Sequence, residues 1–226
     1  SLRNCEMTPV SLRNCEMTPV SKFYGVNNRN GLEIIHSNGV AVQNVNFISD
    51  FTNGIYVYDL LNHRCCGNSY VPGSNEFFEN YSFNGNFERG ASFINSQNIQ
   101  LGLASPANNH NYFIGNYDFG LYLSNCSVVY DYGNLFNTTT FSNTPTSSGG
   151  SIKTAIFCEN LDDFQIEQNI FASIENIAIY SINSQKGVII NNNFINTNNK
   201  AVLLLGKVSN GVNNQIQLSG NRFVAN

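Results

Sequence analysis

A short apolar pattern returns at nearly fixed spacing along most of this chain. Seven stretches with alternating apolar residues begin 23, 36, 30, 34, 23 and 23 residues apart, at Gly31, Gly54, Gly90, Gly120, Thr154, Ile177 and Lys200. Alternation with a period of two is typical of β-strands, and a period of twenty-odd residues is typical of a solenoid whose coils bury their apolar faces by stacking. The sequence therefore predicts an all-β solenoid of about seven coils, each with two short strands and a turn.

The alternation also predicts which side chains face the interior. We expect the second and fourth residues of each strand to face inward and the third to face outward. The predicted inward columns are Leu32, Ile55, Ala91, Leu121, Ala155, Ala178 and Ala201, and Ile34, Val57, Phe93, Leu123, Phe157, Tyr180 and Leu203. The predicted outward column is Glu33, Tyr56, Ser92, Tyr122, Ile156, Ile179 and Val202.

An Asn-x-Phe motif closes most coils. It recurs with its asparagine at Asn111, Asn134, Asn169, Asn192 and Asn221. Stacked phenylalanine rings would fill the interior, and stacked amides would bond from coil to coil. This structural ladder is favoured over a ligand site, because buried amides need partners that neighbouring coils supply.

These repeats resemble the parallel β-helix coils of the pectate-lyase-like superfamily, over residues 31–226. The resemblance implies a right-handed β-helix with a three-faced cross-section. That superfamily includes pectin and alginate enzymes, epimerases, secreted adhesins and bacteriophage tailspikes. The asparagine-rich composition most resembles a tailspike or tail-fibre segment, which implies a homotrimer on a virion tail or elsewhere outside the cell.

Residues 1–10 are repeated without change as residues 11–20. An unchanged repeat beside coils that have diverged strongly indicates an artificial duplication rather than an ancient structural repeat. We therefore expect residues 1–30 to form an N-terminal segment apart from the β-helix at 31–226. The chain has no initiator methionine or signal-peptide pattern and stops within a coil, so we expect an excised piece, truncated at its C-terminal end.

Composition excludes several classes of function. A net charge of −4 with 12% charged residues leaves no basic stripe for nucleic acid. No apolar run is long enough to span a membrane. The six cysteines lack the spacing of a disulfide framework, so we expect reduced thiols. Glu159, Asp162 and Asp163 form an acidic corner without the repeated aspartate spacing of calcium sites, and we expect no metal or cofactor.

Three insertions fall in successive coils, at residues 61–75, 104–110 and 137–150. Loops on a rigid scaffold are where binding residues concentrate, so these loops would wall a groove across the coils. Surface decoration is an equally open interpretation.

The candidate catalytic residues are Glu88, Asp118 and Glu175. Glu88 and Asp118 precede strands of adjacent coils by two residues, so their backbones are expected ~4.8 Å apart. Two carboxylates at that distance do not both ionise easily, which gives an acid beside a base, as in glycosidases. Asp118 and Glu175, two coils apart, would suit an inverting mechanism. The alternative is solvated turn acids paired with Arg89 or Lys153.

The candidate substrate-binding residues are aromatic and amide side chains. Tyr56 and Tyr58 alternate outward from one strand and Tyr122 from another, and the amides of Asn95 and Asn125 lie in turns. Exposed rings bury area on sugar faces and offer a hydroxyl at the tip, although packing between subunits of a trimer is equally open.

The predicted function is recognition of a bacterial surface polysaccharide, accompanied by glycosidic cleavage. A hydrolase is favoured over a lyase, because the calcium-binding acids facing a basic residue that such lyases need are not found in the sequence. The alternative is a non-catalytic adhesin or structural fibre segment.

Overall fold

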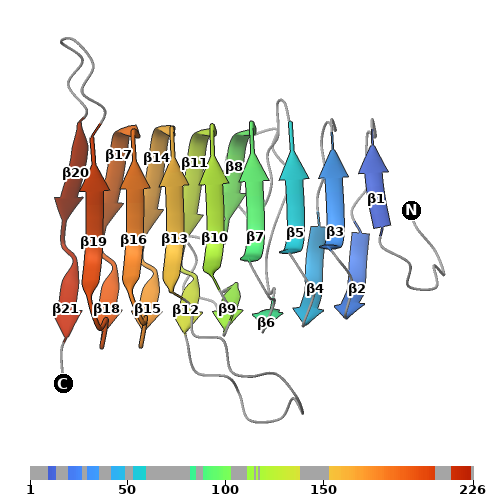
Figure 1. Cartoon of the computed structure of the whole chain (residues 1–226), viewed down its shortest axis with the longest axis horizontal. Helices are drawn as coiled ribbons and strands as arrows, with labels where there is room; N and C mark the ends of the chain where they lie inside the picture. Colours follow the sequence, from blue (N-terminus) through green and yellow to red (C-terminus); the bar gives the residue numbers. More distant parts are fainter. Residues whose placement is uncertain are drawn as a thin grey trace.

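The computed structural model describes residues 10–13, 20–26, 30–35, 42–48, 53–59, 82–84, 89–102, 111–114, 116, 118–137, 153–206 and 215–224. The regular structure within these ranges is all β-strand, arranged in three parallel sheets, of which the first and third begin near the N-terminus and the second begins at Gln97 (Figure 1). Each strand pairs with the equivalent strand of the coil before and the coil after it. The predicted parallel β-helix is confirmed.

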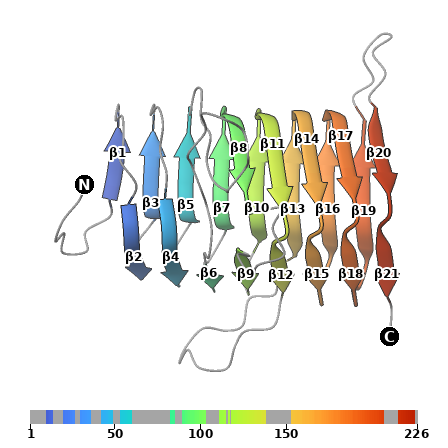
Figure 2. The same ribbon diagram turned by 180° about the vertical axis from the view of Figure 1, so that it is seen from behind.

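The first sheet consists of β1 (Val10–Arg13), β3 (Asn30–Ile35), β5 (Asn53–Tyr58), β7 (Arg89–Ile94), β10 (Phe119–Ser124), β13 (Thr154–Glu159), β16 (Ile177–Ile182) and β19 (Lys200–Leu205). The second sheet, seen from behind in Figure 2, consists of β8 (Gln97–Leu101), β11 (Ser127–Tyr132), β14 (Asp162–Glu167), β17 (Gln185–Ile190) and β20 (Ile216–Ser219). The third sheet consists of β2 (Val20–Val26), β4 (Val42–Ile48), β6 (Ser82–Asn84), β9 (Tyr112–Ile114), β12 (Leu135–Asn137), β15 (Ile170–Ala172), β18 (Asn193–Ile195) and β21 (Arg222–Val224).

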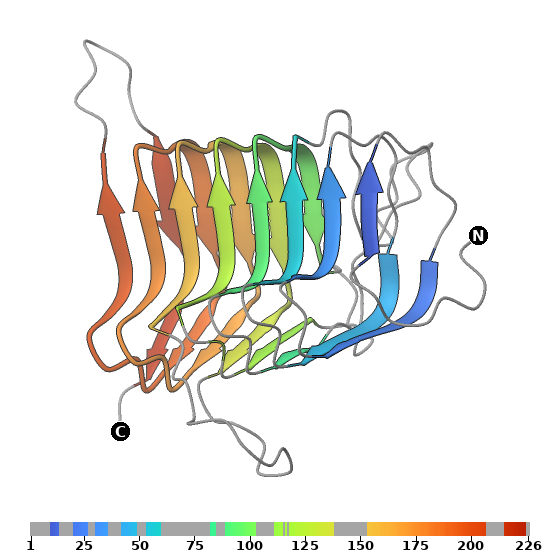
Figure 3. The ribbon, with the colours of Figure 1, turned by 45° about the vertical axis from the view of Figure 1, so that its right-hand side comes forward.

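From β7 onward each coil has three strands rather than the two that the sequence predicted, and the three sheets enclose a common interior (Figure 3). The missed strands are those of the third sheet, which are three residues long in these coils and therefore too short to show an alternating pattern. The sheets also reach into residues 1–30, because β1 pairs with β3 and β2 pairs with β4. The three predicted insertions lie outside the described residues, apart from Asn137.

The predicted register is wrong by one residue in the last three coils of the first sheet. Leu121 pairs with Ile156, and Ile156 pairs with Ile179, so both isoleucines face inward and are fully buried. Phe157 and Tyr180, which were expected inside, lie in the outward column with Tyr122. Since side chains alternate along a strand, a slip of one residue moves the whole strand's side chains to the opposite face.

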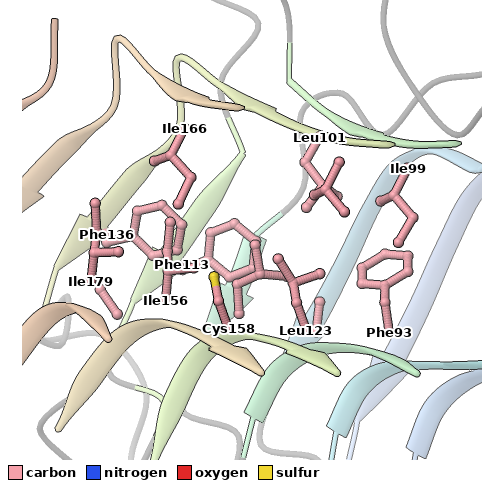
Figure 4. Close-up of a cluster of buried hydrophobic side chains, with 14 of the residues drawn as sticks. Phe93, Ile99, Leu101, Phe113, Leu123, Phe136, Ile156, Cys158, Ile166 and Ile179 are labelled. Carbon is pink, nitrogen blue, oxygen red and sulfur yellow. The ribbon is translucent and has the colours of Figure 1, made fainter. Parts of the chain in front are cut away.

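Phenylalanine rings form the predicted ladder through the interior, and all of them except Phe223 are buried. Phe113, Phe136, Phe171, Phe194 and Phe223 stack in succession, with ring centroids 4.6, 5.1, 4.9 and 5.0 Å apart. Side chains of the first and second sheets, such as Leu123 and Ile166, point toward the same interior (Figure 4). The ladder therefore holds the third sheet against the other two.

The predicted asparagine ladder runs beside these rings. The backbone N–H groups of Asn111, Asn134, Asn169 and Asn192 each donate to the Oδ1 of the motif asparagine in the next coil, over 3.0, 2.7, 2.9 and 3.0 Å. The side-chain amides of Asn134, Asn169, Asn192 and Asn221 donate to backbone carbonyl groups inside the β-helix. The corner before the third sheet is thus hydrogen-bonded from coil to coil, which confirms the structural interpretation of the motif.

Candidate functional site

The outer face of the first sheet gathers aromatic side chains from neighbouring coils. Tyr56, Ser92, Tyr122, Phe157 and Tyr180 occupy one register column across β5, β7, β10, β13 and β16. In-register parallel strands place equivalent residues ~4.8 Å apart, close enough for ring contact. We call Phe119, Tyr122, Phe157 and Tyr180 the aromatic row; each of these side chains is half-buried.

The rings of the aromatic row contact one another continuously. Tyr122 stacks on Phe157 with centroids 5.2 Å apart and planes 6° from parallel. Phe119 lies against both rings, with centroid distances of 5.6 and 5.2 Å. Tyr180 stands perpendicular to Phe157 at 5.4 Å. The row therefore forms one rigid strip that is partly open to solvent.

Arg89 lies at one end of the aromatic row, beside Ser92, which is the residue of the column that has no ring. Its guanidinium carbon lies 3.9 Å from the Tyr122 ring centroid and 5.8 Å from that of Phe119. Its Nη1 donates to the Oγ of Ser92, 3.3 Å away, and Ser92 is fully buried. Because serine is small, the planar guanidinium occupies the space of a missing ring, an arrangement that cation–π attraction stabilises. Tyr122 is therefore covered on both faces and presents its rim and hydroxyl group.

The predicted pair Tyr56 and Tyr58 lies on the same sheet. Tyr56 shares the column of Tyr122, whereas Tyr58 pairs with Ile94, which pairs with Ser124. Both tyrosines are half-buried. At that edge of the sheet, Ser124 Oγ donates to a carboxylate oxygen of Glu159 over 3.3 Å. The outer face thus combines rings, hydroxyl groups and separated charges.

Asn95 and Asn125 lie at the turn between the first and second sheets. Their φ angles are 51° and 52°, a left-handed conformation that asparagine tolerates better than most residues. Asn125 Nδ2 donates to Asn95 Oδ1 over 3.2 Å, and Asn160 Nδ2 donates to Asn125 Oδ1 over 2.9 Å. These amides form a second ladder along the corner, which gives both residues a structural role; a contact with saccharide stays a prediction.

The predicted catalytic column is out of register beyond Asp118. Backbone hydrogen bonds from Thr154 to Asp118 and from Ile177 to Lys153 place Lys153 next to Asp118 in the column. Glu175, which is exposed, lies one residue outside it. Glu88 lies outside the described residues. A catalytic role for these acids stays a prediction.

Asp118 instead forms an ion pair with a lysine. Lys153 Nζ lies 3.5 Å from Asp118 Oδ1, and the two side chains are 48% and 40% exposed. This matches the alternative interpretation of the sequence, a solvated turn acid with Lys153 as its neighbour. An exposed pair of this kind contributes little to stability.

One buried acid was not recognised in the sequence. Asp131 pairs with Leu101 and Ile166 in an inward column of the second sheet and is fully buried. Burial raises its pKa to about 7, and hydrogen bonds from Asn134 and Asn169 oppose this effect. The alternation of Val129 and Asp131 about the outward Tyr130 was the signal that could have found it.

The described cysteines are buried and free. Cys126 and Cys158 carry no disulfide, as predicted for reduced thiols, whereas Cys5, Cys15, Cys65 and Cys66 lie outside the described residues. Burial raises the pKa of Cys126 to about 11 and that of Cys158 well above its usual value. Both thiols therefore stay protonated at neutral pH and are poor nucleophiles.

Among the residues with described positions, no three histidine, cysteine, aspartate or glutamate side chains group in a way that could hold a metal ion. The described part of the chain also contains no helix long and apolar enough to cross a membrane. A hollow of about 490 Å³ lies over β17 and β20, lined by Lys186, Gly187, Val188, Gln215, Ile216 and Gln217. It contains no ring or carboxylate, so the aromatic row is the better candidate site.

No protein-family model matches the chain, and no curated protein sequence is significantly similar to it. Solved structures that match the chain do so at low similarity. The catalytic unit of the thermostable GH87 α-1,3-glucanase from Streptomyces thermodiastaticus strain HF3-3 matches 90% of this chain with 10% identity and a TM-score of 0.36. PfbA, a surface adhesin of Streptococcus pneumoniae, matches 85% with 12% identity and a TM-score of 0.34. The chain spans 48% of the glucanase unit and 61% of the adhesin, and the likeness concerns the fold alone.

Proposed function

We propose that this β-helix binds an extracellular polysaccharide on the outer face of its first sheet. The observation that carries the proposal is the continuous aromatic row with Arg89 at one end. Sugar rings have apolar faces and polar rims, so they fit a surface that combines ring area with hydroxyl groups and charges.

The shape of the row suits a polymer. It and Arg89 come from four successive strands, β7, β10, β13 and β16. Four strands at the usual spacing span ~14 Å along the β-helix, enough for a short run of sugar residues. Because the rings of the row contact one another and Tyr122 lies between Arg89 and Phe157, binding would order few side chains and lose little entropy.

In this proposal the chain is a segment of a tailspike-like receptor-binding protein. It would act as a homotrimer on a virion tail or elsewhere outside the cell, and its ligand would be a bacterial capsule or O-antigen polysaccharide. These finer points rest on the resemblance of the repeats. Glycosidic cleavage by Glu88, Asp118 and Glu175 is not part of the proposal, because Asp118 is paired with Lys153 and Glu175 lies outside the column of Asp118.

The test is affinity electrophoresis of the protein against a panel of bacterial capsule and O-antigen polysaccharides, followed by an assay for reducing ends. The Phe157→Ala, Tyr180→Ala double variant is expected to bind at least tenfold more weakly than the parent, since each ring contact contributes about 1 kcal/mol. The matched control is Tyr130→Ala, because Tyr130 is 40% exposed on the second sheet.

Binding that is lost in the double variant and kept in the control supports the proposal. No binding by the parent, or equal binding by all three proteins, rejects it. Release of reducing ends by the parent that disappears in Asp118→Asn would instead restore the hydrolase prediction.

A further inference from the structure

We propose that the polysaccharide bound on this face is acidic and that Arg89 binds its carboxylate groups. This inference rests on the proposed function of the outer face and adds the chemical class of the ligand. It follows from the contacts of Arg89, which leave its charge without an acidic partner among the residues that the structure describes.

The side chain of Arg89 contacts a hydroxyl group and two aromatic rings. Two other described cations have carboxylate partners, since Lys153 lies 3.5 Å from Asp118 and Lys186 lies 3.0 Å from Asp162, whereas Lys200 donates to the amide oxygen of Asn199. Glu159 lies at the opposite end of the first sheet's strands from Arg89. It pairs with Ser124, which pairs with Ile94, and Ile94 is five residues along β7 from Arg89. Five residues of strand correspond to ~17 Å.

The geometry of Arg89 suits a carboxylate ligand. Stacking on Tyr122 uses one face of the guanidinium, and Nη1 donates to Ser92 Oγ. A guanidinium carries five N–H donors in its plane, so donors remain after the bond to Ser92. Their fork matches the two oxygens of a carboxylate.

The surroundings of Arg89 also fix its position before any ligand binds. Its side chain is half-buried, and the rings of Phe119 and Tyr122 lie beside it. A fixed guanidinium loses little conformational entropy when it binds, which favours it over a mobile surface lysine. A carboxylate held there would leave the sugar ring beside the rim of Tyr122 and the rest of the aromatic row.

The experiment compares matched ligands. Each uronate-containing capsule polysaccharide of the panel is tested beside its carboxyl-reduced form, in which the carboxylates have become primary alcohols. The parent is expected to bind the native form about tenfold more tightly than the reduced form, since hydrogen bonds between two charged groups are stronger than those to a neutral alcohol. Arg89→Gln is expected to lose this preference, binding both forms as the parent binds the reduced one.

Two further variants separate charge from structure. Arg89→Lys keeps the charge without the fork and is expected to give an intermediate preference. Lys186→Gln removes a cation from the second sheet and is expected to bind like the parent. Thermal unfolding of each variant checks that the fold is kept.

Each remaining outcome contradicts a specific part of the argument. Equal binding of native and reduced polysaccharides by the parent overturns the acidic ligand while leaving polysaccharide binding intact. A preference for the native form that persists in Arg89→Gln overturns the role of Arg89. Absence of binding to every polysaccharide of the panel overturns the proposed function and this inference with it.

Discussion

The carboxyl group of Asp131 accepts a hydrogen bond of 2.6 Å from the side-chain amide of Asn134 inside the β-helix. Asp131 is fully buried, and its second oxygen has no hydrogen-bond partner among the described residues. A charged carboxylate is costly in such a place, because the amides of Asn134 and Asn169 replace only part of the water that it had in the unfolded chain. Burial accordingly raises the pKa of Asp131 to about 7.

The protein is therefore expected to become less stable as the pH rises through neutrality. The folded pKa of about 7 exceeds the ordinary aspartate pKa of 3.8, so the folded chain binds more protons than the unfolded chain between these pH values. The associated stability is fully present below pH 3.8 and is lost as the pH rises through about 7. A difference of about three pKa units corresponds to about 4 kcal/mol. Cys126 and Cys158, which also lie in the interior, stay neutral in this window because burial raises the pKa of both thiols.

Urea unfolding of the parent and of Asp131→Asn at pH 5 and pH 8.5 measures this effect. Asparagine has the shape of aspartate and no charge, so the variant should lack the part of the pH dependence that Asp131 causes. The difference between the two proteins isolates that part from the titration of surface groups. The same pH dependence in both proteins would show that Asp131 does not titrate in this range.

The second prediction concerns the ladder of stacked phenylalanine rings. Phe171 stacks between Phe136 and Phe194 and is fully buried, so Phe171→Ala removes contacts on both faces and leaves a cavity. We expect a loss of about 3–5 kcal/mol in the free energy of unfolding. Phe223 is the matched control, because it belongs to the same ladder and is 59% exposed. If Phe223→Ala lowers the free energy of unfolding as much as Phe171→Ala does in urea, then burial does not determine how much a ring contributes to stability.

This ladder was predictable from sequence because the Asn-x-Phe motif fixes two neighbouring positions at once. The asparagine and the phenylalanine of the motif, such as Asn169 and Phe171, are two residues apart in every coil. The motifs of different coils can therefore be aligned whatever the length of the loops between them. The strands of the first sheet contain no motif that fixes their alignment in this way. Ala155 and Ile156 are adjacent, buried and apolar, so alternation alone allows two registers across the step from Gly120, which contains an insertion.

The candidate site depended on that register and was therefore predicted only in part. Tyr56, Tyr58 and Tyr122 were recognised as outward residues, but Phe157 and Tyr180 were assigned to the interior. The contact of Arg89 with Tyr122 joins adjacent coils, and no local pattern in the sequence indicates it. Because of the same one-residue error, Glu175 was predicted to lie in the column of Asp118. The backbone hydrogen bonds put Lys153 and Asn176 in that column instead.

The asparagine ladder makes a third prediction. Asn169 Oδ1 accepts from the backbone N–H of Asn134, and Asn169 Nδ2 donates to the backbone carbonyl group of Asp131. Asn169→Ala leaves both buried groups without partners, which is expected to lower the free energy of unfolding by about 2–5 kcal/mol. The control is Asn198→Ala, at an exposed turn residue, with an expected change below about 0.5 kcal/mol. Similar losses in both variants would show that the ladder bonds are not what stabilises the corner.

The fourth prediction concerns the close packing of Gly187 against Phe164. Phe164 pairs with Gly187 in an inward column of the second sheet, and a Cβ atom at Gly187 would overlap the end of the Phe164 ring. Gly187→Ala is therefore expected to destabilise the fold by about 1–3 kcal/mol through overpacking.

In the background of Phe164→Leu, whose shorter side chain vacates that space, the same substitution should cost at least 0.5 kcal/mol less, a coupling typical of residues in contact. The four proteins of this double-mutant cycle are compared by urea unfolding at one pH. Additive effects would mean that the alanine methyl group does not meet Phe164, and that Gly187 is needed for the backbone of β17 rather than for the space it leaves.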